Sequence, residues 1–346
     1  MTLTLKRRTL IGGGIALAGA ATPLFAQERV TLRLHQFLPP QASVPLHAIK
    51  PWADKVEKDS GGRIRVQLFP TMQLGGRPPE LFDQAKDGVV DVVWTVLGYT
   101  PGRFPKSEVF ELPFLCGTAE AGSKAFQEYV QAHAMDEFAD VKLICVHTHG
   151  PGMFHSRAPI TRLEDLKGMR VRGGSRVINI MLEQMGAVAV GMPVPQVGEA
   201  LSKGVIAATT IPWEVVPALK VHQIVKNHTG FTGPKGMYTQ TFGFVMNKGR
   251  YDKLPADLKK VVDANSGMAA ATLFGRAMDA GDKAGLAEAQ KAKNNIVTLD
   301  AAETQRWQRA ASGVRATWYS EVKAKGIDGE KLVAEAERLL AKHAAA

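Results

Sequence analysis

Short apolar or alternating runs recur along the chain, and amphipathic segments separate them. Positions 30–37 and 63–69 alternate between apolar and polar residues, which predicts two half-buried strands. Positions 89–96 are almost continuously apolar, as in a strand covered on both faces of a parallel sheet. The intervening segments 45–58 and 79–86 have the pattern of helices. This order of strands and helices predicts a doubly wound α/β unit.

A second series of the same kind follows. Its predicted strands are 141–148, 169–173, 187–191 and 205–210, and its predicted helices are 121–138, 175–186 and 195–203. Positions 238–247 predict one further strand. Positions 254–291 predict a single long helix, which at 1.5 Å per residue would measure roughly 50 Å. In a chain with two domains, a helix of that length is expected to lie across both of them.

The composition agrees with two soluble domains. The chain has 346 residues, and a domain takes about 150. Hydrophobic residues make up 45% and charged residues 22%, which excludes a largely disordered chain. Two cysteines exclude a disulfide scaffold and a multi-cysteine metal module. Cys116 and Cys145 could pair in an oxidising compartment, but both lie in apolar runs and we expect them to pack as small hydrophobic residues. The net charge of +10 comes from basic residues spread along the chain, so we expect no nucleic-acid partner.

The first 26 residues have the layout of a secretory signal peptide. Lys6, Arg7 and Arg8 form a basic start, an apolar run covers 9–21, and a cleavage point follows Ala26. The apolar run is too short to span a bilayer, which takes about 20 residues. The paired arginines suit the twin-arginine (Tat) route, and the general secretory (Sec) route stays an alternative. We therefore expect a periplasmic protein.

The chain contains no convincing catalytic motif. Gly117–Lys124 resembles a phosphate-binding loop, but its last two residues stand in the wrong order. Neither a G-x-S-x-G elbow nor a G-x-G-x-x-G turn after the first strand is present. His147, His149 and His155 could hold zinc, yet no carboxylate or cysteine near them in sequence completes a site, so we expect hydrogen-bonded histidines near a cleft. We expect no enzyme, and no catalytic residue, metal or cofactor.

One segment does point to ligand binding. The predicted strand 169–172 carries Arg170 and Arg172, two positions apart, and runs through Gly173-Gly174 into a helix that Ser175 opens. An arginine at such a turn can hold a carboxylate by two parallel hydrogen bonds, and the helix N-terminus adds backbone donors. The alternative is that both arginines are surface charges.

From end to end the chain resembles the periplasmic substrate-binding proteins of tripartite ATP-independent periplasmic (TRAP) transporters, of the dicarboxylate-binding-protein type. The motifs that carry the resemblance are, in chain order, Phe69–Gly76, Asp87–Asp91, Val109–Phe114, Leu163–Gly173 and Leu254–Leu258. The resemblance implies two α/β lobes that close on a ligand in the manner of a Venus flytrap, with the long helix crossing both. It also implies an organic-acid ligand held by one arginine, which falls on Arg172, and delivery to a TRAP membrane permease.

The chain departs from the sialic-acid and C4-dicarboxylate pattern of that family. Gly152 stands where a second site arginine is common, and Ile211 replaces an asparagine. Val96 and Tyr99 stand where sialic-acid binders carry a carboxylate and an arginine. Because polar groups of a ligand would stay unpaired there, the lining favours an apolar or aromatic monocarboxylate.

The residues expected to bind the ligand are the anchor Arg172 together with Phe37, Thr95, Tyr99, Gly173, Ser175, Ile211, Trp213 and Phe242. Trp213 could instead be a core residue, and Trp94 could be either part of the sheet core or part of the lining.

We assign the first lobe to residues 27–149 and about 240–275, and the second to 150–239 and about 276–346. The sequence thus predicts a periplasmic solute receptor, expected to be a monomer, that binds an organic acid and delivers it to a TRAP permease. Two alternatives stay open, a sensory ligand-binding protein and an exported enzyme on the same two-lobed scaffold.

Overall fold

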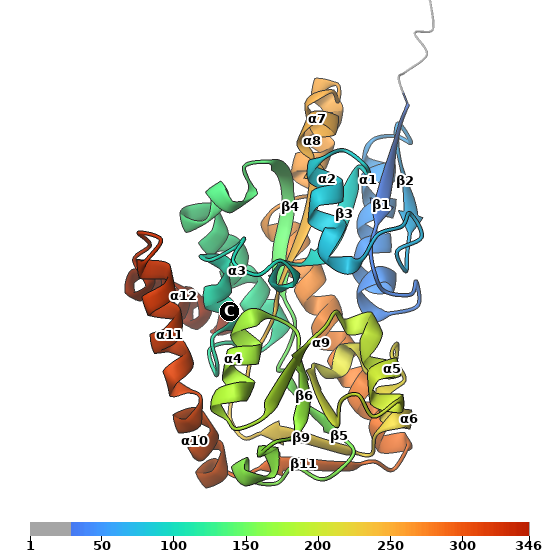
Figure 1. Cartoon of the computed structure of the whole chain (residues 1–346). Coiled ribbons are helices and arrows are strands. Elements are labelled where there is room, and N and C mark those ends of the chain that lie inside the picture. Colours follow the sequence, from blue (N-terminus) through green and yellow to red (C-terminus); the bar gives the residue numbers. More distant parts are fainter. Residues whose placement is uncertain (1–28, 346) are drawn as a thin grey trace, which may run out of the picture.

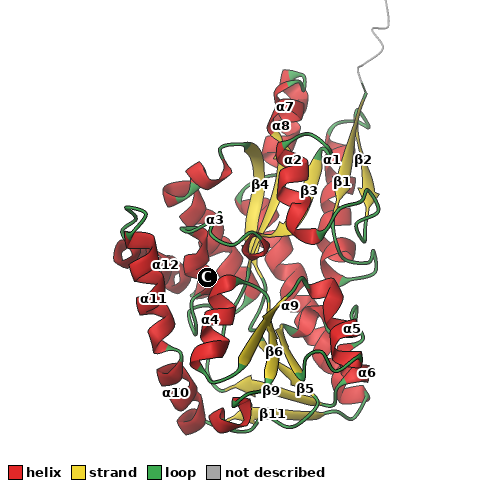
Figure 2. Ribbon diagram, in the orientation of Figure 1, coloured by secondary structure: helices red, strands yellow, loops and turns green. Residues whose placement is uncertain are grey.

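The computed structural model describes residues 29–345, and the predicted signal peptide lies outside the described residues. Two sheets form the centres of two lobes, which confirms the predicted α/β class (Figures 1 and 2). The first sheet has the order β2-β1-β3-β10-β4. Its strands are β1 (Val30–His35), β2 (Ile64–Phe69), β3 (Val92–Val96), β4 (Val141–Thr148) and β10 (Thr241–Asn247). β1 pairs in parallel with β2 and β3, whereas β10 is antiparallel to β3 and β4.

The second sheet has the order β11-β9-β5-β8-β6-β7 and is also mixed. β6 is parallel to β7 and β8, β5 is antiparallel to β8 and β9, and β11 is parallel to β9. The sequence predicts β6, β7 and β8 but not the other three. The strands are β5 (Met153–Ser156), β6 (Arg170–Gly173), β7 (Val188–Gly191), β8 (Ala208–Ile211), β9 (Asn227–Phe231) and β11 (Asn295–Leu299).

Helices cover both sheets. They are α1 (Lys50–Asp59), α2 (Leu81–Lys86), α3 (Ala119–His133), α4 (Arg176–Gln184), α5 (Val197–Ser202), α6 (Val221–Ile224), α7 (Lys248–Asp252), α8 (Ala256–Ala264), α9 (Met268–Lys291), α10 (Ala301–Ala310), α11 (Ser312–Lys323) and α12 (Gly329–Ala344). Cys116 and Cys145 are buried and unpaired, as expected of small hydrophobic residues. None of the helices in 29–345 is long and apolar enough to cross a membrane.

The single long helix predicted for 254–291 is wrong, because the structure has two helices there. α8 ends at Ala264, and Gly267 adopts a left-handed backbone conformation with φ of +67°. The Gly267 N–H donates to Ile144 O of β4 at 2.7 Å instead of continuing the helix. α9 alone has 24 residues, or roughly 36 Å. It still crosses the molecule, since it packs against α3 in the first lobe and the 3₁₀ turn Trp213–Val215 in the second (Figure 1).

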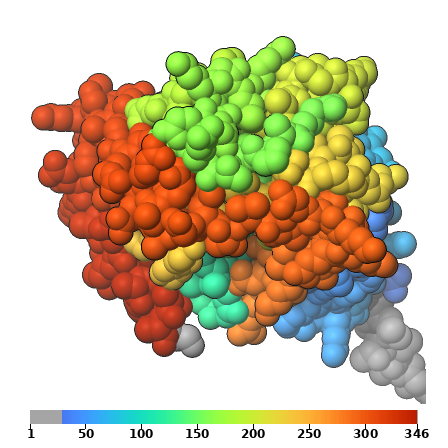
Figure 3. Space-filling model, turned by 90° about the horizontal axis from the view of Figure 1, so that it is seen from below, coloured from blue at the N-terminus to red at the C-terminus, as the bar shows by residue number. Residues whose placement is uncertain are grey.

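The C-terminal helix departs from the expected division into lobes. α12 packs against α3 of the first lobe, although the sequence predicts that residues 276–346 belong to the second lobe. α11 lies between α12 and α4 of the second lobe. Seen from below, the orange residues that follow the start of α9 form a continuous band towards the red C-terminal helices (Figure 3). The lobe boundaries stay a prediction, and the packing of α12 favours placing it with the first lobe.

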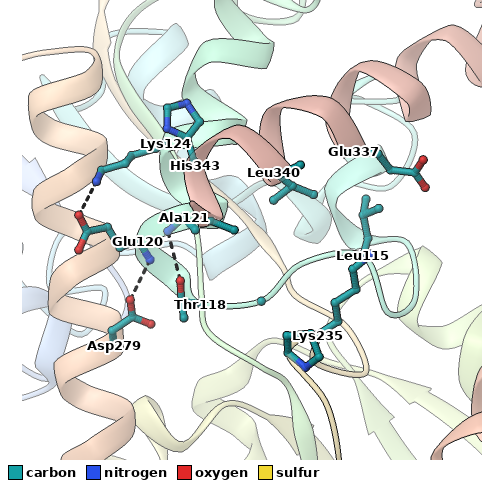
Figure 4. A pocket seen from close by; sticks show the side chains of 14 residues that line it. Leu115, Thr118, Glu120, Ala121, Lys124, Lys235, Asp279, Glu337, Leu340 and His343 are labelled. Carbon is teal, nitrogen blue, oxygen red and sulfur yellow. Dashed lines mark hydrogen bonds and ion pairs between the residues drawn. The ribbon is translucent and has the colours of Figure 1, made fainter. Parts of the chain in front are cut away.

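Two carboxylates on consecutive turns of α9 hold it to both lobes. Asp279 accepts hydrogen bonds from the backbone N–H groups of Ala119 and Glu120, at 2.8 and 2.9 Å, at the start of α3 (Figure 4). Asp282 accepts from the backbone N–H of Glu214 at 2.7 Å. One turn further on, Gly285 lies so close to the turn Trp213–Val215 that a Cβ there would be 2.0 Å from the Trp213 carbonyl oxygen. The helix is therefore in direct backbone contact with the second lobe.

Gly285→Ala should lower the free energy of unfolding by about 1–3 kcal/mol, because the added methyl group overlaps backbone atoms that cannot rotate away. Alanine normally favours a helix over glycine by roughly 0.5–1 kcal/mol, so the expected sign opposes helix propensity. Urea denaturation measures it. Gly249→Ala in α7, where the nearest atom outside its own chain neighbours lies 3.4 Å away, is the control and should leave stability unchanged or slightly raised. Equal stability of Gly285→Ala and wild type would contradict a tight contact between α9 and the turn.

Candidate ligand-binding site

A small cavity of about 30 Å³ lies between the two lobes. A space of this size holds about two water molecules, so the lobes are closed around it. The first lobe contributes mainly aromatic side chains, and the second contributes Arg172 and the segment after β8. The lining residues are Phe37, Leu38, Trp94, Val96, Tyr99, His149, Arg172, Val194, Ile211, Pro212, Glu214, Val215, Gln240, Phe242 and Met278.

Arg172 is the only basic side chain in this lining apart from a histidine, and it is 0% exposed. Its strand β6 lies between β7 and β8, which places the residue in the interior of the sheet. Nε donates to Met192 O at 2.9 Å and Nη1 donates to Thr210 O at 3.1 Å. Nη2 is buried and has no hydrogen-bond partner. Arg170 on the same strand is exposed, so the surface alternative holds for Arg170 and is wrong for Arg172.

No carboxylate within the described range 29–345 forms an ion pair with Arg172. Burying a guanidinium without a counter-charge is costly, typically by several kcal/mol. An anion in the cavity would remove most of that cost by accepting hydrogen bonds from Nη2 and neutralising the charge. The arrangement is therefore suited to binding a carboxylate.

Polar groups near Arg172 are fixed by their own hydrogen bonds. Tyr99 OH accepts from the backbone N–H of Val194 at 2.8 Å, a contact that joins the two lobes. His149 Nδ1 donates to Gly150 O at 2.5 Å, and its Nε2 accepts from the backbone N–H of Gln240 at 3.1 Å. Burial, and then the positive charge of Arg172, lower the pKa of His149 to about 4, so the ring is neutral. The side-chain Nε2 of Gln240 is buried without a partner and is a second free donor.

The opposite wall is a stack of aromatic rings. Phe37 stacks on Trp94 at 4.7 Å between ring centres, and Trp94 stacks on Phe242 at 5.4 Å with an interplanar angle of 3°. Trp94 Nε1 donates to His147 Nε2 at 2.8 Å, so the indole has no polar group left to satisfy. Trp94 thus belongs to both the sheet core and the lining. The wall offers flat apolar surface, which suits a planar ring.

Two of the expected residues do not reach the cavity. The ring of Trp213 lies among His155 and His228, at 5.1 and 4.9 Å between ring centres, because the Trp213–Val215 turn directs it into the core of the second lobe. Thr95 lies between Trp94 and Val96 on β3, and alternation along the strand points it to the other face of the sheet.

Gly173 and Ser175 line a neighbouring, more open hollow of about 470 Å³ that shares Tyr99 with the cavity. Ser175 Oγ is engaged as the cap of α4, where it accepts from the backbone N–H of Ile178 at 3.4 Å. The structure therefore brings Phe37, Tyr99, Ile211 and Phe242 to Arg172, and places Gly173 and Ser175 beside rather than within the cavity.

The zinc alternative for the histidines finds no support. His147 accepts from Trp94, and His155 Nδ1 lies 2.7 Å from His228 Nδ1 in a chain that continues to Asn294. Burial lowers the pKa of His155 and of His228, to about 3 and about 4, which keeps both rings neutral. Across residues 29–345 no group of three or more histidine, cysteine or acidic side chains is arranged to hold a metal ion.

The structure also explains the glycine at the position of the family's second arginine. A Cβ on Gly152 would lie 2.1 Å from the ring of Tyr238, so that ring fills the space where a longer side chain would start. Tyr238 is itself buried and packs edge-on against His149 at 5.3 Å. The Tyr238 ring thus leaves no room at position 152 for the second arginine that the family resemblance implies.

A larger hollow of about 620 Å³ lies at the surface between α3, α12 and the segment around Lys235 (Figure 4). Its charged side chains are largely paired within the protein. Lys124 binds Glu120, Glu337 binds Arg315 and His343 binds Glu128. Because it offers no buried group without a partner comparable to Arg172 Nη2, the smaller interior cavity is the better candidate.

Sequence reasoning missed two polar residues of the lining, Glu214 and Gln240. Gln240 lies at the end of a predicted strand, where alternation does not reveal which lobe a side chain faces. Glu214 directly follows Trp213, and the sequence pattern predicts the aromatic residue as the one that lines the site. No local signal distinguishes Trp213 from Glu214, because contacts with α9 set the turn that orients both side chains.

Comparison with known proteins agrees with this geometry. The family model for the bacterial extracellular solute-binding proteins of family 7 matches residues 36–321. A TRAP solute-binding protein from a marine metagenome, described as specific for aromatic acid ligands and solved with 3-hydroxybenzoate, is 44% identical with a TM-score of 0.90, over 91% of this chain and 99% of that one. A TRAP solute-binding protein from Rhodoferax ferrireducens, solved with copurified benzoate, is 47% identical with a TM-score of 0.89, over 91% and 98%.

Among curated proteins, the outer membrane transporter protein TsaT of Comamonas testosteroni is 26% identical over 317 residues, which is 90% of this chain and 92% of that protein. The C4-dicarboxylate-binding periplasmic protein DctP of Rhodobacter capsulatus is 24% identical over 94% of this chain and 98% of its own length. Since the family model covers most of the chain and the solved TRAP proteins match both lobes, the chain belongs to the bacterial extracellular solute-binding proteins of family 7, the periplasmic receptors of TRAP transporters.

Proposed function

We propose that the protein is a periplasmic receptor for a monocarboxylate with an aromatic or apolar body, which it delivers to a TRAP permease. The observation that carries this proposal is Arg172, a fully buried guanidinium with one unpartnered donor in a cavity otherwise lined mainly by apolar side chains. A carboxylate satisfies the donor and the charge, and an apolar body suits the remaining wall.

In the proposed binding mode the carboxylate accepts hydrogen bonds from Arg172 Nη2 and from Gln240 Nε2, the two free donors of the lining. The body of the ligand lies against Phe37 and Phe242 on the stacked wall, which requires the lining to move apart from the cavity of about 30 Å³ that it encloses in this structure. A second carboxylate on the ligand would find no second cation, because Tyr238 fills the space beside Gly152. The relatives solved with 3-hydroxybenzoate and benzoate support the aromatic class.

We further propose that the protein acts as a monomer and that it binds its ligand without converting it. The sensory role and the exported enzyme remain the alternatives. Incubation of the purified protein with benzoate, followed by recovery of benzoate unchanged, supports the receptor over the enzyme.

Arg172→Ala should weaken benzoate binding by roughly 30-fold to several thousand-fold, which corresponds to about 2–5 kcal/mol for the loss of one partner of a buried charge pair. Arg172→Lys should also bind poorly, because a lysine cannot retain the carbonyl contacts and offer a second donor to the ligand in the same geometry. Isothermal calorimetry measures both affinities. Arg170→Ala, an exposed arginine on the same strand, is the matched control and should stay within about threefold of wild type, a change below 1 kcal/mol. Benzoate affinity of Arg172→Ala within that range would show that Arg172 is not the anchor.

Ligand binding should close the two lobes. Across the cleft, Arg176 of α4 pairs with Glu108 of the first lobe at 2.5 Å, and Tyr99 OH accepts from Val194 N. These contacts can form only when the lobes are together, so saturating benzoate should reduce the radius of gyration in small-angle scattering. Arg172→Ala at the same benzoate concentration should keep the radius of the ligand-free protein. An unchanged radius of wild type at a benzoate concentration that saturates it in calorimetry would rule out the closure.

The mature protein should begin near Gln27 after export from a native host. The basic start and the short apolar run before Ala26 are the reason. The intact mass of protein released from the periplasm measures this directly. A mass that still includes residues 1–26 would contradict both the cleavage and the assignment of these residues as a signal peptide. Replacement of Arg7 and Arg8 by lysines distinguishes the export routes, since it should block the twin-arginine route and spare the general one.

A further inference from the structure

A carboxyl group of the cavity lining plays no part in holding the ligand carboxylate. Glu214 is 5% exposed, and its Oε1 is buried without a hydrogen-bond partner. The side chain is held in place from two sides. Its backbone N–H donates to Asp282, and its Cγ packs so closely on α9 that a Cβ on Gly281 would lie 2.6 Å from it. The carboxyl also accepts a hydrogen bond from the backbone N–H of Val44, so Glu214 contributes one buried oxygen without a partner to the lining.

Glu214 and Arg172 line the same cavity but form no ion pair with each other. Burial raises the pKa of Tyr99 and of Tyr238, and the charge of Arg172 opposes that rise, whereas burial and this charge together lower the pKa of His149. The carboxyl of Glu214 instead has Asp282 as its charged neighbour, and burial together with that neighbour raises the pKa of Glu214 to about 8. Each of the two side chains thus contributes its own buried atom without a partner to the cavity lining, Nη2 of Arg172 and Oε1 of Glu214.

We propose that Glu214 accepts a hydrogen bond from a hydroxyl group on the part of the ligand remote from its carboxylate. This inference rests on the proposed function and narrows it to hydroxylated aromatic or apolar monocarboxylates. Arg172 and Gln240 would hold the carboxylate at one end, and Glu214 would bind the hydroxyl group at the other.

The physical argument is the cost of an unsatisfied acceptor. A buried carboxyl oxygen without a partner loses its hydration and gains nothing in return. A ligand hydroxyl satisfies it, whereas a bare ring leaves it unpaired. Sites built to hydrogen-bond a ligand hydroxyl reject analogues that lack one far more strongly than apolar pockets distinguish by size.

The test compares benzoate with 3-hydroxybenzoate and 4-hydroxybenzoate on the full mature protein by calorimetry. Wild type should bind at least one hydroxybenzoate tenfold or more tightly than benzoate. Glu214→Met removes the acceptor and keeps the length of the side chain, so it should reduce that ratio to below about threefold. The readout is the ratio of affinities within each variant, so a change of the cavity that affects all three acids alike leaves the ratio unmoved.

Glu214→Gln serves as the second variant, because it retains an acceptor oxygen and should keep most of the preference even if Glu214→Met does not fold. A wild-type ratio below threefold, a ratio unchanged in folded Glu214→Met, or a ratio lost in Glu214→Gln would each overturn the inference. Failure of the proposed function looks different, since wild type would then bind none of the three acids. Circular dichroism and the thermal midpoint of each variant report whether it is folded.

Discussion

The proposed function of the molecule depends on the buried guanidinium of Arg172. Two of its nitrogens are tied to the carbonyl oxygens of Met192 and Thr210, and the third faces the cavity without a partner. Burial of this charge without a counter-charge is costly, and the proposed carboxylate ligand would remove most of that cost. In the proposed cycle, separation of the lobes would let water solvate the charge, and closure would exclude water once the anion is bound.

The crossing helix α9 joins the two lobes. Asp279 holds the start of α3 and Asp282 holds the turn before Val215, so adjacent turns of one helix reach into both lobes. Close approach at Gly285 keeps that contact rigid on the second-lobe side. Closure then engages contacts that bridge the cleft directly, of which the pair Arg176–Glu108 is the most buried ionic one. The contacts of α9 with both lobes are thus separate from the contacts that bridge the cleft, as the proposed ligand-dependent closure requires.

Selectivity in this site follows from which polar atoms of the lining have no hydrogen-bond partner. The aromatic wall of Phe37, Trp94 and Phe242 has no unpaired hydrogen-bonding group, since the one indole N–H donates to His147. Tyr238 fills the space beside Gly152, which supports the proposal that the ligand carries one carboxylate. The unpartnered atoms of Arg172, Gln240 and Glu214 are then the features that a ligand must match. An apolar acid satisfies the first two, and a hydroxylated one satisfies all three.

The sequence by itself determined the α/β class and most strands of the first sheet, and it singled out Arg172, which the structure places buried in the lining of the cavity. These features leave local traces, since strand alternation, helix periodicity and a strand–Gly-Gly–helix turn are read over a few residues. Only the tertiary structure decided the break before α9, because Gly267 is drawn out of the helix by a carbonyl of β4 more than 100 residues earlier. It likewise decided that Trp213 lies in the core while its neighbour Glu214 lines the cavity. Both outcomes depend on long-range packing, and adjacent residues of one turn carry no local mark of which will face the ligand.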